Sequence, residues 1–273
     1  SHGLPRPRNL EAAREFEAIV RDAGAVPATI AVVDGVPRVG LDEAALERIA
    51  GEGVAKASVR DLPILAARGG TGATTVAGTV AIAARAGIRV FATGGLGGVH
   101  HGAATTFDES ADIPTLARHP VAVVCAGVKS VLDVGATLER METLSVPVVG
   151  WRTDRFPMFW LSSSPHELDW RVDAVDEIAA ILRDQDATRS GAGLVVANPL
   201  PLDQQWDPAE HDAVVAQASA EAERDGIHGK AVTPYLLGRI VELSEGRSLE
   251  VNLALVRSNI RLAAAIATAY AAG

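Results

Sequence analysis

The sequence has 273 residues, of which 48% are hydrophobic and 4% aromatic, and its formal net charge is −9. This length suffices for one α/β domain whose core is built on Ala, Val, Leu and Ile. The acidic balance argues against a nucleic-acid polymer as partner, which requires a basic patch. No run approaches the roughly 18 apolar residues that span a bilayer. A single cysteine, Cys125, forms no intramolecular disulfide, which predicts a cytoplasmic protein.

Helix signals recur through the first third of the chain. Ser, Asp and Asn commonly cap helix N-termini, and glycine commonly follows a helix C-terminus. The candidate N-caps are Asn9, Asp42 and Ser58, and the glycines that close helices are Gly24 and Gly87. Asp61 lies three residues after Ser58, which predicts a capping box with Asp in place of Glu.

A β-hairpin is predicted near the N-terminus. The apolar runs 28–33 and 36–39 flank Asp34-Gly35, a pair typical of two-residue hairpin turns.

Strands and helices alternate regularly in the middle of the chain. The predicted helices are 75–86, 113–118 and 130–144, and the predicted strands are 88–92, 121–126 and 146–150. Near-continuous apolar strands that alternate with helices are typical of a parallel sheet covered on both faces. We therefore predict an α/β fold, layered α/β/α, with a largely parallel central sheet and the N-terminal hairpin added to it.

The last third of the chain is less regular. Its expected elements are a helix through Ile178 and Leu182, a strand at 194–197, a helix capped at Asp207-Pro208-Ala209-Glu210, a helix opened by Thr233-Pro234, and a long helix from Ser248 to Tyr270. The sequence contains no internal repeat or obvious linker, so we predict a single domain over residues 1–273.

Residues 93–130 are the most informative part of the chain. Five glycines, two histidines and three acids crowd together directly after one predicted strand, and Lys129 follows the next strand. Ligands of parallel sheets bind beyond the carboxyl ends of the strands, and glycine lets the backbone approach a ligand closely. Packing alone does not require this mixture, so we predict an active site here.

Lys129 is the candidate nucleophile. At the start of the predicted helix 130–144 a cation opposes the helix dipole, and that dipole together with burial lowers the pKa of an amine. A neutral amine can attack carbon, whereas the alternative is a solvated lysine. Lys56, near the end of a short segment, suits a phosphate or carboxylate contact or is a surface lysine.

The acids Asp108, Glu109 and Asp112 form a cluster with two interpretations. One carboxylate plus waters is a normal way to hold Mg²⁺ or Mn²⁺. Helix capping by Ser110 or Asp112 is the alternative. No spacing of Cys and His supports zinc.

Other polar residues also have two interpretations. Adjacent histidines point in different directions, so at most one of His100 and His101 is expected to face a site. The segment 69–75 is suited to a phosphate or is an ordinary glycine turn. Asn252, expected in the first turn of the last helix, either caps that helix or contacts a ligand. Asn198 either reaches a ligand or belongs to a turn.

Sequence blocks along nearly the whole chain match a known family. The blocks are S-H-G-L-P-R-P-R-N, V-P-A-T-I-A-V-V-D-G, R-D-L-P, G-A-T-T-V-A, R-V-F-A-T-G-G-L-G-G-V-H, T-F-D-E-S-A-D, V-A-V-V-C-A-G-V-K-S, G-L-V-V-A-N-P and T-P-Y-L-L. In these blocks the chain resembles the pseudouridine-5′-phosphate glycosidase family, which includes indigoidine synthase A-like proteins.

The resemblance implies an activity and a set of site residues. Family members hydrolyse the carbon–carbon glycosidic bond of pseudouridine 5′-phosphate to uracil and ribose 5-phosphate, use a divalent metal, typically Mn²⁺, and assemble as trimers. The resemblance places the nucleophile on Lys129 and the metal-binding aspartate on Asp108. The positions matching substrate contacts or other active-site residues are Lys56, Val76, Thr93, His100, Ser110, Ala111, Asp112 and Asn252.

The departing carbon of uracil is a poor leaving group, which explains the need for a lysine. An amine joined to the first carbon of the opened sugar provides an iminium-type electron sink, and an acid must protonate uracil. In the family that acid is a glutamate on a strand just before S-H-G. The present sequence begins at Ser1, so we expect this strand and its glutamate upstream of it. Two alternatives stay open: another Schiff-base sugar-phosphate enzyme of aldol or isomerase type, and a non-catalytic sugar-phosphate-binding module that lacks this acid.

Overall fold

Short apolar strands build a five-stranded sheet within residues 4–227 and 232–273, the part of the chain that the computed structural model describes. In sheet order the strands are β10 (Arg171–Val172), β9 (Val148–Trp151), β11 (Leu194–Ala197), β7 (Ala122–Cys125) and β5 (Val90–Ala92). Every neighbouring pair is parallel. The predicted parallel sheet is therefore confirmed.

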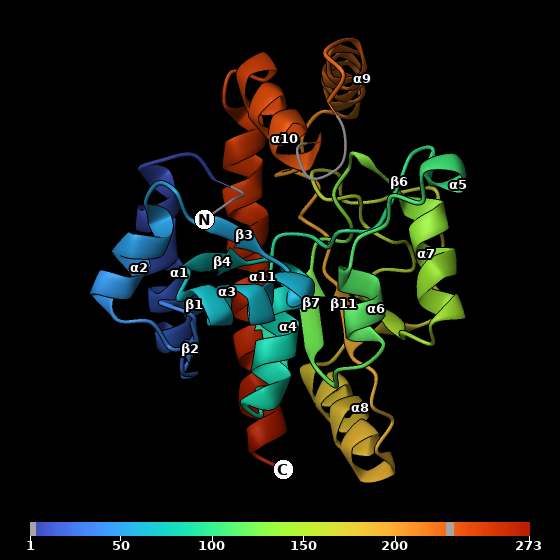
Figure 1. The fold of residues 1–273 in the computed structure, drawn as a ribbon. Helices are drawn as coiled ribbons and strands as arrows, with labels where there is room; N and C mark the ends of the chain where they lie inside the picture. The colour runs from blue at the N-terminus through green and yellow to red at the C-terminus, as the bar shows by residue number, and fades with distance from the viewer. Residues whose placement is uncertain (1–3, 228–231) are drawn as a thin grey trace.

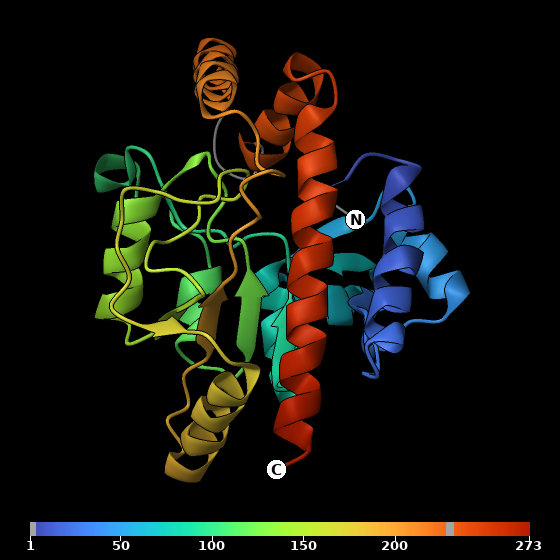
Figure 2. The same ribbon diagram turned by 180° about the vertical axis from the view of Figure 1, so that it is seen from behind.

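Helices cover both faces of this sheet (Figures 1 and 2). Ala122 and Val124 share a core cluster with residues of α8 (Val175–Thr188) and α11 (Arg247–Ala271). Val123 and Cys125 belong instead to the cluster of α4 (Val76–Arg85), α6 (Asp112–Leu116) and α7 (Val134–Thr143). Because successive side chains of a strand point to opposite faces, a strand that is apolar throughout requires helices on both. The predicted α/β/α layering is confirmed.

The N-terminal hairpin belongs to a second, four-stranded sheet of the described residues. Its order is β2 (Val36–Val39), β1 (Ile30–Val33), β4 (Gly72–Thr74) and β3 (Ala55–Ala57). Val33 pairs with Val36, and Asp34 and Gly35 between them have φ values of 52° and 78°. Both values are positive, as the predicted two-residue hairpin turn requires.

The glycine-rich segment 69–75 is in part a strand, which neither sequence interpretation predicted. Its residues Gly72–Thr74 form β4, which is antiparallel to β1 and parallel to β3. Three residues carry too short an apolar pattern to indicate a strand, and only the distant partners define this one.

Helices α1 (Arg8–Asp22), α2 (Glu43–Ala50) and α3 (Leu62–Arg68) lie with this second sheet on one side of the molecule (Figure 1). The Asp42 side chain caps α2, and the Ser58–Asp61 capping box opens a 3-10 turn before α3, both as predicted. The prediction for Asn9 is wrong, because α1 already begins at Arg8. Asn9 instead donates its amide to the Ala50 carbonyl oxygen at 3.1 Å.

The predicted helix 130–144 begins later than expected. Residues Leu132–Asp133 form β8, which pairs antiparallel with β6 (Val99–His100). The Asp133 carboxylate then caps α7 by accepting from the Ala136 N–H at 2.9 Å. Lys129 therefore lies in a loop five residues before α7 and not in its first turn.

The carboxyl ends of β5, β7 and β11 face the side of the molecule where α5 (Ala103–Thr106), β6, α9 (Pro208–Arg224) and α10 (Val232–Leu243) lie (Figure 1). Asp207 caps α9 as predicted. α10 and α11 each begin one residue earlier than predicted, at Val232 and Arg247. The single-domain organisation stays a prediction.

Among the helices of residues 4–227 and 232–273, none is both long and apolar enough to cross a membrane.

Candidate active site

Two loops meet at the carboxyl edge of the parallel sheet and are joined through their backbones. The first follows β5 and the second follows β7. The Leu96 N–H donates to the Gly127 carbonyl oxygen at 2.9 Å, and the Lys129 N–H donates to the Leu96 carbonyl oxygen at 3.2 Å. These two backbone hydrogen bonds fix the position of the Lys129 backbone relative to the glycine-rich loop.

The side chain of Lys129 is half-buried against that loop. Its Nζ lies 3.5 Å from the Gly95 carbonyl oxygen, a long hydrogen bond. Burial lowers the pKa of Lys129 below its ordinary value; the Asp112 carboxylate opposes this effect and Lys56 adds to it. The predicted contribution of a helix dipole is wrong, since α7 begins only at Val134. The direction of the pKa shift stands, with burial as its main cause.

Asp112 joins the glycine-rich loop to the start of α4. It is 5% exposed, and its two carboxylate oxygens accept from the Ala77 and Gly97 N–H groups, each at 2.8 Å. Its own N–H donates to Ser110 Oγ at 3.2 Å. The capping prediction for Ser110 or Asp112 is wrong, because α6 begins at Asp112 and its N-cap, Ala111, has no side-chain cap. The Asp112 side chain instead bonds two distant segments.

The remaining residues of this predicted cluster lie around Asp112. Ser110 donates its N–H to the Gly98 carbonyl oxygen at 2.9 Å, and Ala111 is exposed just before α6. Val76 is the first residue of α4 and precedes Ala77, which Asp112 binds. The structure thus brings Val76 and the 110–112 triplet together.

Gly97 shows why the loop needs a residue without a side chain. A Cβ at this position would collide with the Ser110 side chain and lie 2.8 Å from an Asp112 carboxylate oxygen. Any larger residue would therefore push Asp112 away from the loop.

His100 and Asp108 lie side by side near the two lysines. The His100 N–H donates to the Asp108 carbonyl oxygen at 3.0 Å. Burial lowers the pKa of His100; the Asp108 charge opposes this, and the charges of Lys129 and Lys56 reinforce it. His101 is exposed, which agrees with the prediction that at most one of the two histidines faces the site.

The three acids have different partners. Glu109 forms an ion pair with Arg140 at 2.8 Å, and Asp112 is bound to backbone as described. Across the described ranges, no group of three or more His, Cys, Asp or Glu side chains is arranged to hold a metal ion. Asp108, the third acid, is half-buried beside His100.

Lys56 reaches the site from the second sheet. It is the central, exposed residue of β3, opposite Ala73 of β4. Its charge influences both His100 and Lys129, so it lies in their neighbourhood although it is distant in sequence.

Thr93 and Asn252 complete the predicted set. The Thr93 N–H donates to the Val124 carbonyl oxygen at 3.0 Å, which continues the β5–β7 pairing into the loop. Asn252 Oδ1 lies 3.3 Å from the position of a Cβ on Gly94. Asn252 is in the second turn of α11 and not in its first, so the prediction of a capping role is wrong. It faces the glycine-rich loop.

One buried residue of this region was not predicted. Asn259 of α11 is 0% exposed and donates its amide to the Thr93 carbonyl oxygen at 2.8 Å. The signal in the sequence is an amide at helical spacing from apolar residues, four after Leu255 and three before Leu262, and it indicates a buried polar contact without identifying the partner.

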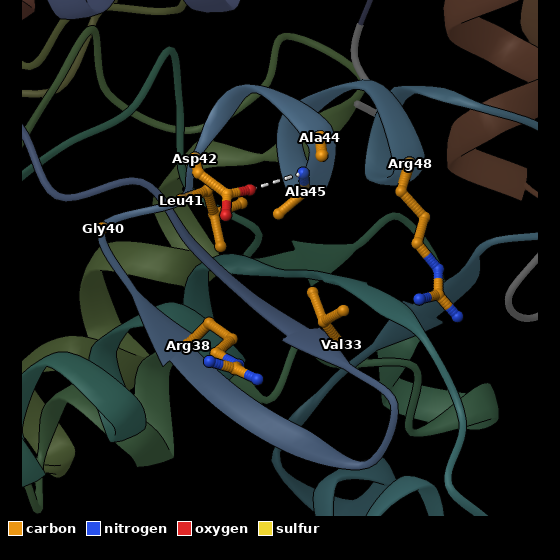
Figure 3. Close-up of a pocket in the computed structure, with 8 residues that line it drawn as sticks. All are labelled: Val33, Arg38, Gly40, Leu41, Asp42, Ala44, Ala45 and Arg48. Carbon is orange, nitrogen blue, oxygen red and sulfur yellow. Dashed lines mark hydrogen bonds between the residues drawn. The ribbon is translucent and has the colours of Figure 1, made fainter.

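A surface pocket of about 250 Å³ lies elsewhere, between the hairpin and α2 (Figure 3). Its lining residues are Val33, Arg38, Gly40, Leu41, Asp42, Ala44, Ala45 and Arg48. It shares no residue with the predicted site.

The fold is a parallel α/β sheet with a glycine-rich loop and a half-buried lysine at its carboxyl edge. These features are typical of the α/β proteins that bind small molecules at that edge. The sequence profile described as "Indigoidine synthase A like protein" matches residues 1–269. The chain belongs to this family.

Relatives of known name cover the chain almost completely. Two are called pseudouridine-5′-phosphate glycosidase: one from Salinispora tropica is 60% identical over 100% of this chain and 85% of its own length, and one from Frankia alni is 58% identical over 100% and 76%. The solved prealnumycin C-glycosynthase in complex with ribulose 5-phosphate has a TM-score of 0.91 at 37% identity, covering 98% of this chain and 88% of that one. An indigoidine synthase A-like protein from Thermotoga maritima has a TM-score of 0.90 at 37% identity, with 97% and 88% covered.

Proposed function

We propose that this protein hydrolyses the carbon–carbon glycosidic bond of pseudouridine 5′-phosphate to uracil and ribose 5-phosphate. The observation that carries the proposal is the half-buried Lys129 amine, held against a glycine-rich loop in a chain 60% identical to a protein of that name. An amine whose pKa is lowered by burial is available in its neutral form to attack carbon.

The proposed reaction begins with opening of the ribose ring. The Lys129 nitrogen bonds to C1′ and loses a proton, while the bond from C1′ to the ring oxygen breaks and that oxygen gains a proton. Uracil C5 then gains a proton and the C1′–C5 bond breaks, so that its electrons remain on uracil and C1′ becomes an iminium carbon. Water adds to C1′, which releases ribose 5-phosphate and restores the amine. By resemblance, a glutamate supplies the proton on C5.

The surrounding residues support binding of the phosphate and the sugar. Lys56 adds a positive charge near Lys129, and Val76 begins α4 directly before Ala77, whose N–H binds Asp112. Thr93, His100, Ser110, Ala111 and Asn252 lie along the same loop system, and we propose that they contact substrate. Asp112 holds the loop in place.

The test is release of uracil by the protein expressed from its complete reading frame, incubated with pseudouridine 5′-phosphate and Mn²⁺. We expect turnover in the wild type and a loss of at least roughly 1,000-fold in Lys129→Ala, since the covalent route is removed. A folded, metal-loaded wild type that releases no uracil would refute the proposal. A Lys129→Ala variant that keeps its rate would remove this lysine from the mechanism.

We further propose a divalent cation, Mn²⁺, at Asp108. In the described part of the chain this carboxylate forms no ion pair, and His100 lies beside it. A hard cation that keeps several waters fits a single carboxylate. When bound, it would supply positive charge and ordered water close to the substrate phosphate.

Asp108→Asn is expected to weaken Mn²⁺ binding at least about 10-fold, measured by equilibrium dialysis in the absence of substrate. The matched control is Glu109→Gln, because that neighbouring acid is paired with Arg140. Equal Mn²⁺ affinity of Asp108→Asn and the wild type would exclude Asp108 as the ligand.

A trimeric assembly and a cytoplasmic location stay predictions. Light scattering would test the trimer against the 28.3 kDa mass of one chain.

A second function is favoured by one neighbour: the C-glycosynthase, whose structure contains ribulose 5-phosphate. The same amine can join a pentose phosphate to a nucleophilic ring carbon in the direction of synthesis. Formation of pseudouridine 5′-phosphate from uracil and ribose 5-phosphate would measure how strongly this protein works in that direction.

A further inference from the structure

A buried pair of amides lies between the sheet and the last helix, and the proposed reaction does not use it. Asn198 follows β11 and is 5% exposed, whereas Asn259 of α11 is 0% exposed. Asn198 Nδ2 donates to Asn259 Oδ1 at 2.9 Å and to Ser258 Oγ at 3.1 Å. Asn259 Nδ2 donates to the carbonyl oxygens of Thr93 at 2.8 Å and Gly94 at 3.3 Å.

Each amide has one orientation that satisfies these bonds. Because Asn259 Oδ1 accepts from Asn198, its Nδ2 must face the two carbonyl oxygens of the loop. Asn198 is itself tied to the sheet, since its N–H donates to the Cys125 carbonyl oxygen at 2.8 Å. The pair therefore fixes the loop relative to the strand that leads to Lys129.

A polar pair in this position costs stability unless every group is bonded. The neighbouring α11 side chains Leu255 and Ile260 are buried and apolar. An apolar residue at position 259 would therefore fill the same space without the cost of burying a polar group. A fully bonded amide gives directional contacts that an apolar side chain does not provide. Its value lies in setting where the Thr93 carbonyl group points and in supporting the Gly94 carbonyl group, whose oxygen also accepts from the Ala126 N–H at 2.9 Å.

These two carbonyl groups immediately precede the one that meets the reacting amine. Gly95 supplies the oxygen 3.5 Å from Lys129 Nζ, and Leu96 then forms both backbone bonds to the Lys129 loop. From the same helix, Asn252 lies against Gly94. A small rotation of the Thr93–Gly94 peptides would therefore move the oxygen that contacts the amine.

We propose that Asn259, held by Asn198, is a positioning residue that sets the Thr93–Gly95 turn and thereby the place of the Lys129 amine. The catalytic part of this inference rests on the proposed function. The position of the amine can be measured without any assay of activity. Asn259 bonds Asn198 and the carbonyl oxygens of Thr93 and Gly94, so it acts through the loop.

The experiment compares Asn259→Leu, which removes the amide at similar volume, with Asn9→Leu as matched control. Asn9 is also buried and also donates its amide to a distant carbonyl oxygen, that of Ala50 at 3.1 Å, but in α1. In Asn259→Leu we expect kcat to fall roughly 10- to 100-fold, as for a displacement of about 1 Å at a reacting group, with a smaller change in KM. In Asn9→Leu we expect lower thermal stability and an unchanged kcat.

A second measurement does not depend on activity. The sequence contains three lysines, Lys56, Lys129 and Lys230, so acetylation by acetic anhydride can be followed at each by peptide mass spectrometry. We expect the labelling rate of Lys129 relative to Lys56 to change at least threefold in Asn259→Leu and in the isosteric Asn259→Asp, and to stay unchanged in Asn9→Leu.

The outcomes separate the two proposals. If the wild type releases no uracil, the proposed function fails, while a changed labelling ratio still supports the positioning role. An unchanged labelling ratio with unchanged kcat in the folded Asn259 variants overturns the positioning role. If both Asn259 variants fail to fold where Asn9→Leu folds, the amide is structural only, and the inference is overturned as well.

Discussion

At the scale of single residues, the site depends on an amine that the fold partly removes from water. Burial lowers the pKa of Lys129, while the nearby Asp112 carboxylate opposes that effect. Desolvating an amine costs free energy as long as the unfolded chain keeps it protonated. The same burial that lowers the pKa of Lys129 therefore reduces the stability of the folded protein.

Replacing Lys129 with Met removes this cost. We expect Lys129→Met to lose turnover and to be more stable than the wild type by roughly 1 kcal/mol at pH 7. The folded pKa is lowered, so the cost is complete below that pKa and disappears as the pH rises through the unfolded value of about 10.4. Thermal melting at pH 7 and at pH 10.5 measures both effects. A lower melting temperature for the variant at pH 7 would contradict this view.

At the scale of elements, helices outside the sheet hold the loops of the site. α7 supplies Thr137, which is 0% exposed; its Oγ1 accepts from the Val99 N–H at 2.9 Å and donates to the Asp133 carbonyl oxygen at 2.6 Å. Val99 begins β6, directly after the glycine-rich loop. One hydroxyl thus connects the start of α7 to the strand that carries His100.

Thr137→Val keeps the shape of the side chain and leaves the buried Val99 N–H without its acceptor. We expect a loss of about 1–3 kcal/mol in the free energy of unfolding, measured by urea denaturation. Thr143→Val is the control on the same helix, since the exposed Thr143 hydroxyl donates only to the Glu139 carbonyl oxygen. We expect its effect to stay within about 0.5 kcal/mol. Equal losses in the two variants would mean that the Val99 contact carries no stability.

At the scale of the whole molecule, α11 connects the parts that build the site. This helix packs against α8, α10, β5 and β7 and also against α1, which lies with the second sheet (Figure 2). Arg257 of α11 forms a bidentate ion pair with Glu15 of α1. Since Lys56 belongs to the second sheet and Lys129 follows the first, their relative position depends on this connection.

The ion pair makes a small, pH-dependent contribution to stability. Hydrogen bonding to Arg257 lowers the pKa of Glu15, so the contribution is present above the unfolded pKa and is lost as the pH falls through the folded one. Both side chains are about one-third exposed, so we expect Glu15→Gln to cost at most about 1 kcal/mol at pH 7. The difference in melting temperature from the wild type should shrink as the pH falls through the folded pKa of Glu15, and a difference that does not change with pH would assign the effect to packing.

Local signals were sufficient to predict much of the fold. The Asp34-Gly35 turn, the Asp42 cap and the apolar strand around Cys125 are each encoded within a few neighbouring residues, and the structure contains all three. The same local signals placed Lys129 and the glycine-rich loop at the carboxyl edge of a parallel sheet, because alternating strands and helices leave few other arrangements. The sequence by itself determined the layers and the position of these two loops at the carboxyl edge of the sheet.

Tertiary structure decided what each polar group contacts. Asp112 binds Gly97 and also Ala77, 35 residues before it, and Asn259 binds Thr93, which lies 166 residues away. β4 exists only because β1 and β3 pair with it, and the lowered pKa of Lys129 comes from surrounding protein and not from a helix that begins beside it. Such contacts depend on how distant segments pack, and periodicity and capping carry no information about that packing.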